Sequence, residues 1–304
     1  MAAGLTLPNL FLVGAMKGGT TSAHGMLASH PGVYSPHVKE PNHFSTDIHR
    51  HPHRLMGRTV HAFANIYMIK NRRDYLKLYE RAPDESQYAI DSSTAYLYST
   101  DASRNIADFN PDAKIIILLR DPVDRAWSEY RMNRSIGVET ADFAQACERE
   151  REAFEAGRSF MWKRYIQAGL YGDQVERYLA AFSRDKVYVD IVDRPGRTLD
   201  AVVDDAAAYL GLDPDLITSR QRENEAKSSR FPLLNSLLYY SGVKALISRI
   251  APASVKSSAK EYFYAPEQSA PAPIDRASLL PIFKESTDKL ARLTGLDVDH
   301  WRRA

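Results

Sequence analysis

A glycine-rich segment near the amino terminus has the composition of an anion-binding turn. The sequence MKGGTTS spans Met16 to Ser22 and follows the apolar run Leu10–Val13. Such a run is typical of a buried parallel strand, and we expect a helix over Thr21–Ser29. Unpaired N–H groups at the start of a helix attract phosphate or sulfate, and glycines let the backbone approach the anion closely. The segment therefore predicts an anion site, to which Lys17 adds a full positive charge.

A second candidate for anion binding follows the run KIIILL at Lys114–Leu119. This run predicts a buried strand that stops at the sequence RDP. Asp121 can cap the helix that we expect to reach Met132, and Pro122 suits its first turn. Arg120 therefore lies at the carboxyl end of a strand, where open α/β sheets place ligands. A guanidinium there can hold a phosphate with two parallel hydrogen bonds.

The composition limits the classes of partner. The 304 residues include 40 Lys and Arg against 38 Asp and Glu. This balance indicates no general attraction to nucleic acid, so any basic site must be local. One such cluster, the His- and Arg-rich segment 49–73, could line a cleft for an anionic glycan or be a solvated face. The one cysteine, Cys147, excludes disulfide scaffolds and cysteine metal clusters.

Two further features bear on metal and membrane. The histidines of segment 49–73 lack cysteine or carboxylate partners at ligand spacing, so we expect no structural metal. The amino terminus has no basic leader, and no apolar run reaches the roughly 20 residues that span a bilayer. We therefore expect a cytoplasmic protein without an integral membrane segment.

Strand and helix patterns alternate along the chain. This alternation predicts an α/β fold in which helices flank a central, mostly parallel sheet. We expect a single domain over residues 1–304, with a carboxyl-terminal helical segment from about 270 to 304 packed on it. A loop is expected over Glu223–Pro232. The other expected strands are Gly32–Ser35, Tyr88–Ile90 and Val187–Val192, and the other expected helices include Ala141–Ala156, Tyr171–Phe182, Leu199–Leu210 and Leu279–Leu293.

Taken together, these motifs resemble those of sulfotransferases that use 3′-phosphoadenosine 5′-phosphosulfate. MKGGTTS resembles the 5′-phosphosulfate loop of that family, and IILLRDPVDRAWSEY resembles its 3′-phosphate segment. Further similarity comes from KEP at Lys39–Pro41, IDSSTAYLY at Ile90–Tyr98 and GLDVDHW at Gly295–Trp301. The likeness is greatest to bacterial and carbohydrate (heparan-sulfate-type) members. It implies a P-loop-like three-layer fold and adenosine 3′,5′-bisphosphate as the nucleotide product, with no metal required.

The resemblance also implies residue roles. Lys39–Pro41 resembles the segment in which heparan-sulfate-type enzymes carry a glutamate base, which implies Glu40 as the base. His43 is the alternative, because small-molecule sulfotransferases use a histidine. Lys17 would stabilise the charge that builds on the leaving phosphate. The residues implied in binding the donor are Lys17, Gly18, Gly19, Thr20, Thr21 and Ser22 for the phosphosulfate, Arg120 and Ser128 for the 3′-phosphate, and Lys227, Ser228, Ser229 and Arg230 in a covering loop.

Several readings of function stay open at this point. The acceptor is expected to be a hydroxyl or amine of a carbohydrate or glycoconjugate; the alternative is a small molecule, lipid or polyketide with His43 as base. A P-loop kinase would need Lys and then Ser or Thr after the second glycine, where this chain has Thr20 and Thr21. A non-catalytic nucleotide-binding module would keep the anion loop and need no base. The oligomeric state and the identity of the acceptor are left open.

Overall fold

A five-stranded parallel sheet forms the centre of the structure. The computed structural model describes residues 7–50, 54–55, 58–59, 69–135, 138–156, 163–220, 227–229, 264–266 and 275–303. The strand order is β2-β5-β1-β6-β7, and every neighbouring pair is parallel. These strands are β1 (Leu10–Gly14), β2 (Val33–Tyr34), β5 (Tyr88–Ser92), β6 (Lys114–Leu119) and β7 (Val187–Ile191). The expected α/β class with a parallel sheet is confirmed, and the strand over Lys114–Leu119 has the expected bounds.

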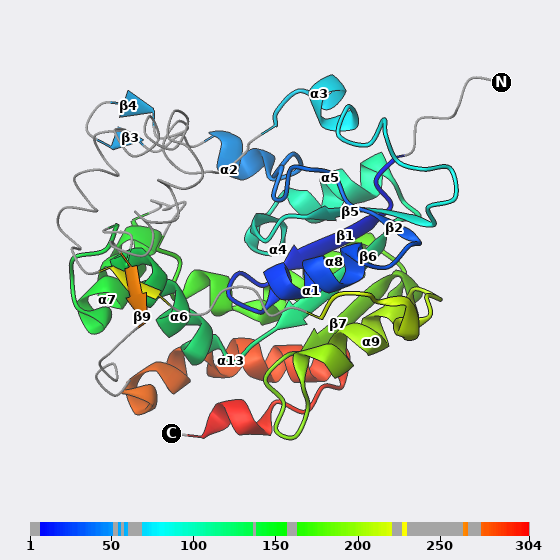
Figure 1. The fold of residues 1–304 in the computed structure, drawn as a ribbon. Helices are drawn as coiled ribbons and strands as arrows, with labels where there is room; N and C mark the ends of the chain where they lie inside the picture. The colour runs from blue at the N-terminus through cyan, green and yellow to red at the C-terminus, as the bar shows by residue number, and fades with distance from the viewer. Residues whose placement is uncertain are drawn as a thin grey trace.

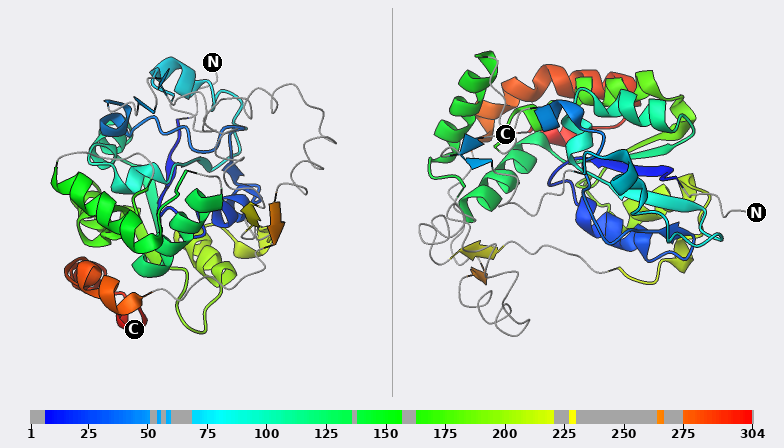
Figure 2. Two further views of the ribbon diagram at one scale, coloured as in Figure 1. Left: turned by 90° about the vertical axis from the view of Figure 1, so that its left-hand side faces the viewer. Right: turned by 90° about the horizontal axis from the view of Figure 1, so that it is seen from above.

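Helices cover both faces of this sheet, which gives three layers (Figures 1 and 2). Helices α1 and α9 cover one face, and α4, α5 and α8 cover the other, where α13 packs against α8. The described α-helices are α1 (Thr20–Ala28), α2 (Thr46–Arg50), α3 (Arg72–Leu76), α4 (Ala95–Tyr98), α5 (Ala102–Phe109), α6 (Pro122–Ser135), α7 (Phe143–Glu155), α8 (Tyr171–Ala181), α9 (Leu199–Tyr209) and α13 (Arg276–Thr294).

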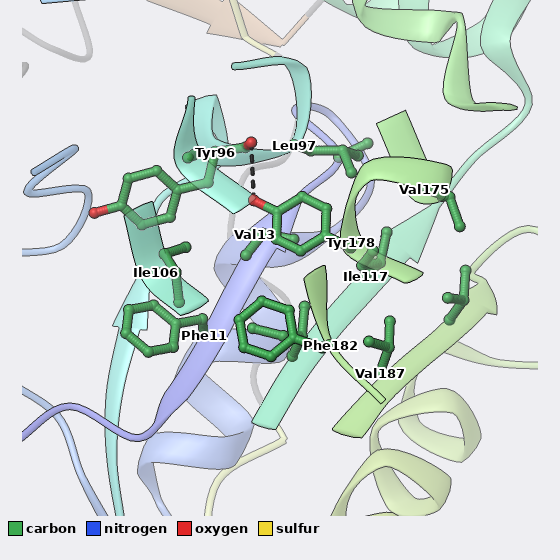
Figure 3. Packing of buried hydrophobic residues seen from close by; sticks show 14 of the residues in the cluster. Phe11, Val13, Tyr96, Leu97, Ile106, Ile117, Val175, Tyr178, Phe182 and Val187 are labelled. Atoms are coloured by element: carbon green, nitrogen blue, oxygen red, sulfur yellow. Dashed lines mark hydrogen bonds between the residues drawn. The ribbon is translucent and has the colours of Figure 1, made fainter. Parts of the chain in front are cut away.

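Alternation along the central strands explains the two cores. Phe11 and Val13 of β1 point into the core beneath α4, α5 and α8, whereas Leu10 and Leu12 point into the core beneath α1 and α9. Because side chains alternate between faces, a strand buried on both sides is apolar along most of its length, as β1 is. Figure 3 shows the first core, where the Tyr178 hydroxyl donates to the backbone oxygen of Tyr96 at 2.9 Å.

The carboxyl-terminal helix α13 is fastened along α8. An added Cβ at Gly172 would lie 2.7 Å from the backbone oxygen of Ser286, so this glycine permits the close approach of the two helices. Lys289 of α13 pairs with Asp173 and with Glu176 of α8, each at 2.6 Å. Helix α13 therefore packs on the layer that covers the central sheet.

Two short antiparallel pairs lie outside the central sheet. Strand β3 (Arg54–Leu55) pairs with β4 (Arg58–Thr59), and β8 (Lys227–Ser229) pairs with β9 (Tyr264–Pro266). The expected loop over Glu223–Pro232 is therefore wrong at its centre. Strand β8 owes its form to a partner about 35 residues later in the chain, and the polar sequence KSS gives no local signal of such pairing.

Candidate active site

The turn between β1 and α1, residues 15–19, forms an anion cradle. An added Cβ at Gly18 would lie 2.7 Å from the backbone oxygen of Leu118, so only glycine fits there without a shift. Gly19 has a φ of 74°, in the left-handed region that glycine tolerates. In the described chain no side chain caps α1, and its first turn carries no acidic residue. Its first backbone N–H groups and the positive end of the helix dipole are thus suited to an anion.

Lys17 extends from this cradle toward α6. Its Nζ lies 3.8 Å from the Sδ of Met132. Burial lowers the pKa of Lys17, and the nearby charges of Arg120 and two further arginines lower it too, while Glu129 opposes the shift. The charges around Lys17 are positive on balance, which favours an anion.

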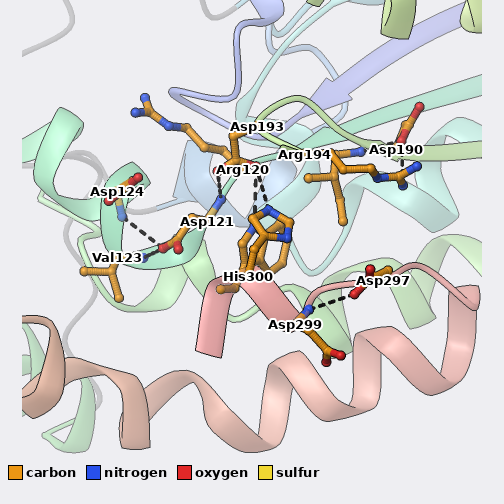
Figure 4. A network of polar contacts seen from close by, with 12 residues as sticks. Arg120, Asp121, Val123, Asp124, Asp190, Asp193, Arg194, Asp297, Asp299 and His300 are labelled. Atoms are coloured by element: carbon orange, nitrogen blue, oxygen red, sulfur yellow. Dashed lines mark hydrogen bonds and ion pairs between the residues drawn. The ribbon is translucent and has the colours of Figure 1, made fainter. Parts of the chain in front are cut away.

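The segment Arg120–Pro122, here called the RDP turn, joins β6 to α6. The Asp121 carboxylate accepts hydrogen bonds from the backbone N–H groups of Val123 and Asp124, at 2.8 and 3.2 Å, and so caps α6. The Arg120 side chain points away from these contacts (Figure 4). No hydrogen bond or ion pair joins its guanidinium to another of the described residues. Arg120 is therefore available to an anion.

Helix α6 begins at the RDP turn and passes close to the cradle. Ser128 is half-buried and lies one helical turn before Met132, the residue that Lys17 contacts. Residues four apart share a helix face, so Ser128 lies on the face that Lys17 approaches. Because β1 and β6 are neighbours in the sheet, their carboxyl ends bring the cradle and the RDP turn to one edge. Lys17, Arg120 and Ser128 thus lie at one edge of the sheet, and their binding roles stay predictions.

Glu40 lies at the same edge, beyond the end of β5. Its backbone N–H donates to the oxygen of Ser92 at 3.0 Å, and its φ of 61° is in the left-handed region. Lys39 Nζ lies 2.8 Å from Oε1 of Glu40, and the Thr94 hydroxyl donates to Oε2 at 3.3 Å. The Glu40 side chain is 33% exposed, so its carboxylate is oriented by two neighbours and still open to a ligand.

His43 has a more enclosed environment. Its Nδ1 donates to the backbone oxygen of Ile69 at 2.6 Å, and its ring stacks on Tyr75 with centroids 4.3 Å apart. Burial lowers the pKa of His43; the hydrogen bond to Ile69 opposes this shift, and the nearby charge of Arg72 adds to it. In the neutral ring Nε2 is then the acceptor, and the lowered pKa makes it a weaker base than a free imidazole.

A match to a sequence family completes these observations. The sequence profile of the sulfotransferase family matches residues 8–202, which include the cradle, Glu40 and the RDP turn. The chain belongs to the sulfotransferase family.

Known proteins of this family give the range of similarity. The chain is 28% identical over 214 residues to the mouse bifunctional heparan sulfate N-deacetylase/N-sulfotransferase 3; the match covers 68% of this chain and 23% of that protein. It is 28% identical over 210 residues to the human heparan sulfate glucosamine 3-O-sulfotransferase 3B1, over 68% of this chain and 46% of that protein. These matches thus span less than half of each relative.

A solved structure extends the similarity to most of the chain. The sulfotransferase from Alicyclobacillus acidocaldarius superposes with a TM-score of 0.72 at 28% identity, covering 98% of this chain and 100% of that one. The expected P-loop-like fold of a sulfotransferase is therefore confirmed.

The segment predicted to cover the donor is described only in part. The backbone of Lys227–Ser229 forms β8, which lies against α6, the helix that carries Ser128. Arg230 lies outside the described residues, as does most of the basic segment 49–73. Among the described helices, none is long and apolar enough to cross a bilayer.

Sequence reasoning missed a buried carboxylate beneath Glu40. Asp91 accepts hydrogen bonds from the hydroxyls of Tyr75, Ser93 and Tyr96 at 2.7 to 2.8 Å. Burial raises the pKa of Asp91 to about 6, against the effect of these three donors. The Ser93 hydroxyl also accepts the backbone N–H of Asn42. This network anchors the KEP segment to β5; its one sequence signal is the polar run DSST after apolar residues.

His24 was also missed, and it links α1 to the strand end that carries Glu40. Its Nδ1 lies 2.7 Å from the hydroxyl of Ser92, and its Nε2 lies 3.1 Å from that of Ser35. Burial lowers the pKa of His24 to about 4, and Lys39 contributes to the shift. A neutral His24 therefore joins the cradle helix to the ends of β5 and β2.

Proposed function

We propose that the protein transfers a sulfuryl group from 3′-phosphoadenosine 5′-phosphosulfate to a hydroxyl or amine, by in-line displacement with Glu40 as base. The observation that carries this proposal is the meeting of two anion sites at one sheet edge, the cradle after β1 and Arg120 after β6, with Lys17 of the cradle close to Arg120. A nucleotide with phosphate groups on both its 3′ and 5′ positions matches two separate cationic sites. A nucleoside triphosphate would need only the cradle.

The described residues fit such a donor. The cradle can hold the 5′ end through the backbone of Gly18 and Gly19, the hydroxyl residues Thr20, Thr21 and Ser22, and the ammonium of Lys17. When bound, the donor supplies the sulfuryl group.

A second site can hold the 3′-phosphate. Arg120 offers a guanidinium without a protein partner among the described residues, and Ser128 lies on the adjoining helix face. Lys227, Ser228, Ser229 and Arg230 stay assigned, as a proposal, to a segment that closes over the nucleotide. The proposed reaction requires no metal ion.

Lys17 and Glu40 divide the electrostatic work of the reaction. The Lys17 ammonium is placed to stabilise negative charge on the oxygen that leaves with the nucleotide. An ionised Glu40 can accept the proton that the attacking group of the acceptor must lose. The ammonium of Lys39 holds one oxygen of the Glu40 carboxylate, and the hydroxyl of Thr94 fixes the direction of the second.

The alternative base is His43, in an enzyme acting on a small molecule, lipid or polyketide. Its Nε2 is free to accept a proton when Nδ1 donates to Ile69. Its lowered pKa and its stacking on Tyr75 nevertheless favour a role in shaping the site. The geometry therefore supports Glu40 more strongly.

The acceptor that we propose is a carbohydrate or glycoconjugate. The matched relatives are named for heparan sulfate N-sulfation and glucosamine 3-O-sulfation, and Lys39 and Glu40 lie at the exposed side of the site. We also propose that the chain acts in the cytoplasm as one domain over residues 1–304.

The test is transfer of label from a radiolabelled sulfate donor to fractionated glycans, lipids and small hydroxyl compounds, without added metal. We expect label in the glycan fraction and far slower labelling with Glu40→Gln. Label in the lipid or small-molecule fraction, lost in His43→Asn and kept in Glu40→Gln, would support the alternative acceptor class. Nucleotide binding without transfer to any acceptor would indicate a non-catalytic module.

A further inference from the structure

The peptide unit between Arg120 and Asp121 is hydrogen-bonded at both of its polar groups. Its C=O accepts the hydroxyl of Tyr171 at 2.9 Å, and its N–H donates to Oδ2 of Asp193 at 2.8 Å. Asp193 follows β7, and its backbone neighbour Val192 continues the pairing of β7 with β6. Because these two contacts fix the peptide plane that follows the Cα of Arg120, they also fix the direction in which the Arg120 side chain leaves the strand.

The carboxyl-terminal segment holds the other oxygen of Asp193. The indole N–H of Trp301 donates to Oδ1 at 3.3 Å. Nε2 of His300 lies 3.8 Å from the same atom (Figure 4). Trp301 is 1% exposed, and its ring packs beside that of Tyr171 with centroids 6.0 Å apart. Both groups that bond the Arg120–Asp121 peptide, Asp193 and Tyr171, are thus held in place by one buried tryptophan.

A second contact from the same part of the chain reaches the RDP turn. Arg276, the first residue of α13, donates to Oδ2 of Asp121 at 2.6 Å and to Oδ1 of Asp124 at 2.8 Å. Asp121 is 4% exposed, so its charge is stabilised by Arg276 and by the N–H groups that it caps. The start of α13 therefore fastens the beginning of α6.

We propose that Asp193, Trp301 and Arg276 form a clasp that orients Arg120 toward the 3′-phosphate of the nucleotide, with Asp193 as the positioning residue. This inference rests on the proposed function, in which Arg120 binds that phosphate. The clasp makes recognition of the 3′-phosphate depend on residues 73 to 181 positions later in the chain. Its effect on nucleotide recognition can be distinguished from its effect on stability, because Lys289 fastens α13 to α8 without contacting the RDP turn.

The experiment measures the affinity for adenosine 3′,5′-bisphosphate relative to AMP by calorimetry, together with the melting temperature. Asp193→Ala leaves two buried N–H donors without an acceptor and frees the Arg120–Asp121 peptide. We expect it to reduce the preference for the bisphosphate by about tenfold, the worth of one charge-assisted hydrogen bond, with AMP affinity unchanged. Asp193→Asn keeps one acceptor oxygen and should restore part of the preference.

Two variants of α13 form a matched pair. Arg276→Ala and Lys289→Ala each remove a cation that fastens α13, but only Arg276 contacts the RDP turn. We expect both to lower the melting temperature and only Arg276→Ala to reduce the preference for the bisphosphate. This pair keeps the test decisive even where Asp193→Ala fails to fold. In a background of Arg120→Ala, adding Asp193→Asn should change the preference no further, because both act on one contact.

The outcomes separate this inference from the proposed function. Equal affinity of the wild type for bisphosphate and AMP would contradict the proposed function itself. A wild-type preference that Arg120→Ala abolishes, and that Asp193→Asn and Arg276→Ala leave intact, would overturn the clasp alone. A loss of preference in Lys289→Ala equal to that in Arg276→Ala would show a general effect of α13 and would likewise overturn it.

Discussion

The two sides of the site are held in different ways. The cradle side, with Lys17 and Glu40, is shaped largely by backbone contacts: the close packing of Gly18 on the backbone oxygen of Leu118, and the bond from the N–H of Glu40 to the oxygen of Ser92. The RDP turn instead depends on Asp193 and Arg276, which lie 72 and 155 residues from Asp121 in the chain. The residues proposed to act on the reacting bond and the residue proposed to bind the 3′-phosphate are thus positioned by different sets of contacts, which mutations can change separately.

The largest expected effect on the cradle side comes from Glu40→Gln. The change keeps the size of the side chain and removes its basic oxygen. Turnover should fall by about 10² to 10⁴, the usual contribution of a general base, while the preference for bisphosphate over AMP stays intact. Single-turnover assays with an identified acceptor would measure this, with the exposed Glu85→Gln as control. Full activity of the Glu40→Gln variant would show that Glu40 is not the general base.

Lys17→Ala should have the next largest effect. Loss of a cation that meets charge developing in the transition state typically costs about 10² to 10³ in turnover. The melting temperature should change little, because burial desolvates the ammonium and lowers the pKa of Lys17, so this side chain adds little to stability. The lowered pKa also predicts an alkaline loss of activity below the ordinary pH range of lysine. An unchanged turnover in a folded variant would identify the cradle as a structural turn.

Gly18→Ala and Gly25→Ala compare two glycines of the same region. A Cβ at Gly18 would meet two backbone oxygens, whereas a Cβ at Gly25 within α1 has no atom within 4 Å. We expect Gly18→Ala to cost about 1 to 3 kcal/mol of stability and to weaken binding of both nucleotides. Gly25→Ala should gain about 0.5 to 1 kcal/mol. Denaturant unfolding and calorimetry measure both; equal effects would contradict the close packing of the cradle.

A smaller effect is expected on the pH dependence of stability through His24. The pKa of His24 is about 4 in the folded state, against 6.5 for an unperturbed histidine in the unfolded chain. The unfolded chain therefore binds more protons between these two pH values. The contribution of His24 is therefore complete above pH 6.5 and is lost as the pH falls toward 4. The fall in melting temperature over this window should be shallower in His24→Asn. The exposed control His37→Asn should keep the wild-type slope; an unchanged slope in both would contradict a neutral, buried His24.

The sequence predicted those parts of the site that depend on neighbours in the chain. The cradle, Lys17 and Arg120 follow from apolar runs, glycines and a strand that ends at RDP, and the structure brings them to one sheet edge. The expected strand at Lys114–Leu119 has the bounds of β6 because six apolar or amphipathic residues in a row suit a central parallel strand. Local pattern and tertiary structure agree there.

Contacts between distant segments could not be predicted in the same way. Nothing near Asp193 in the sequence indicates its bonds to Asp121 and Trp301. The pairing of β8 with β9 and the hydroxyl network around Asp91 likewise depend on partners elsewhere in the chain. Such contacts are properties of the folded topology, and local propensity does not determine them.

The central claim is that Arg120 and the cradle together bind a nucleotide that carries phosphate on both its 3′ and 5′ positions. Calorimetric titration of the wild type and Arg120→Ala with adenosine 3′,5′-bisphosphate and with AMP, without magnesium, tests it most directly. A charge-assisted contact is worth about 1.5 to 3 kcal/mol, so the wild type should prefer the bisphosphate by roughly 10- to 150-fold and Arg120→Ala should lose most of that preference. Equal affinities of the wild type for the two nucleotides would contradict the claim.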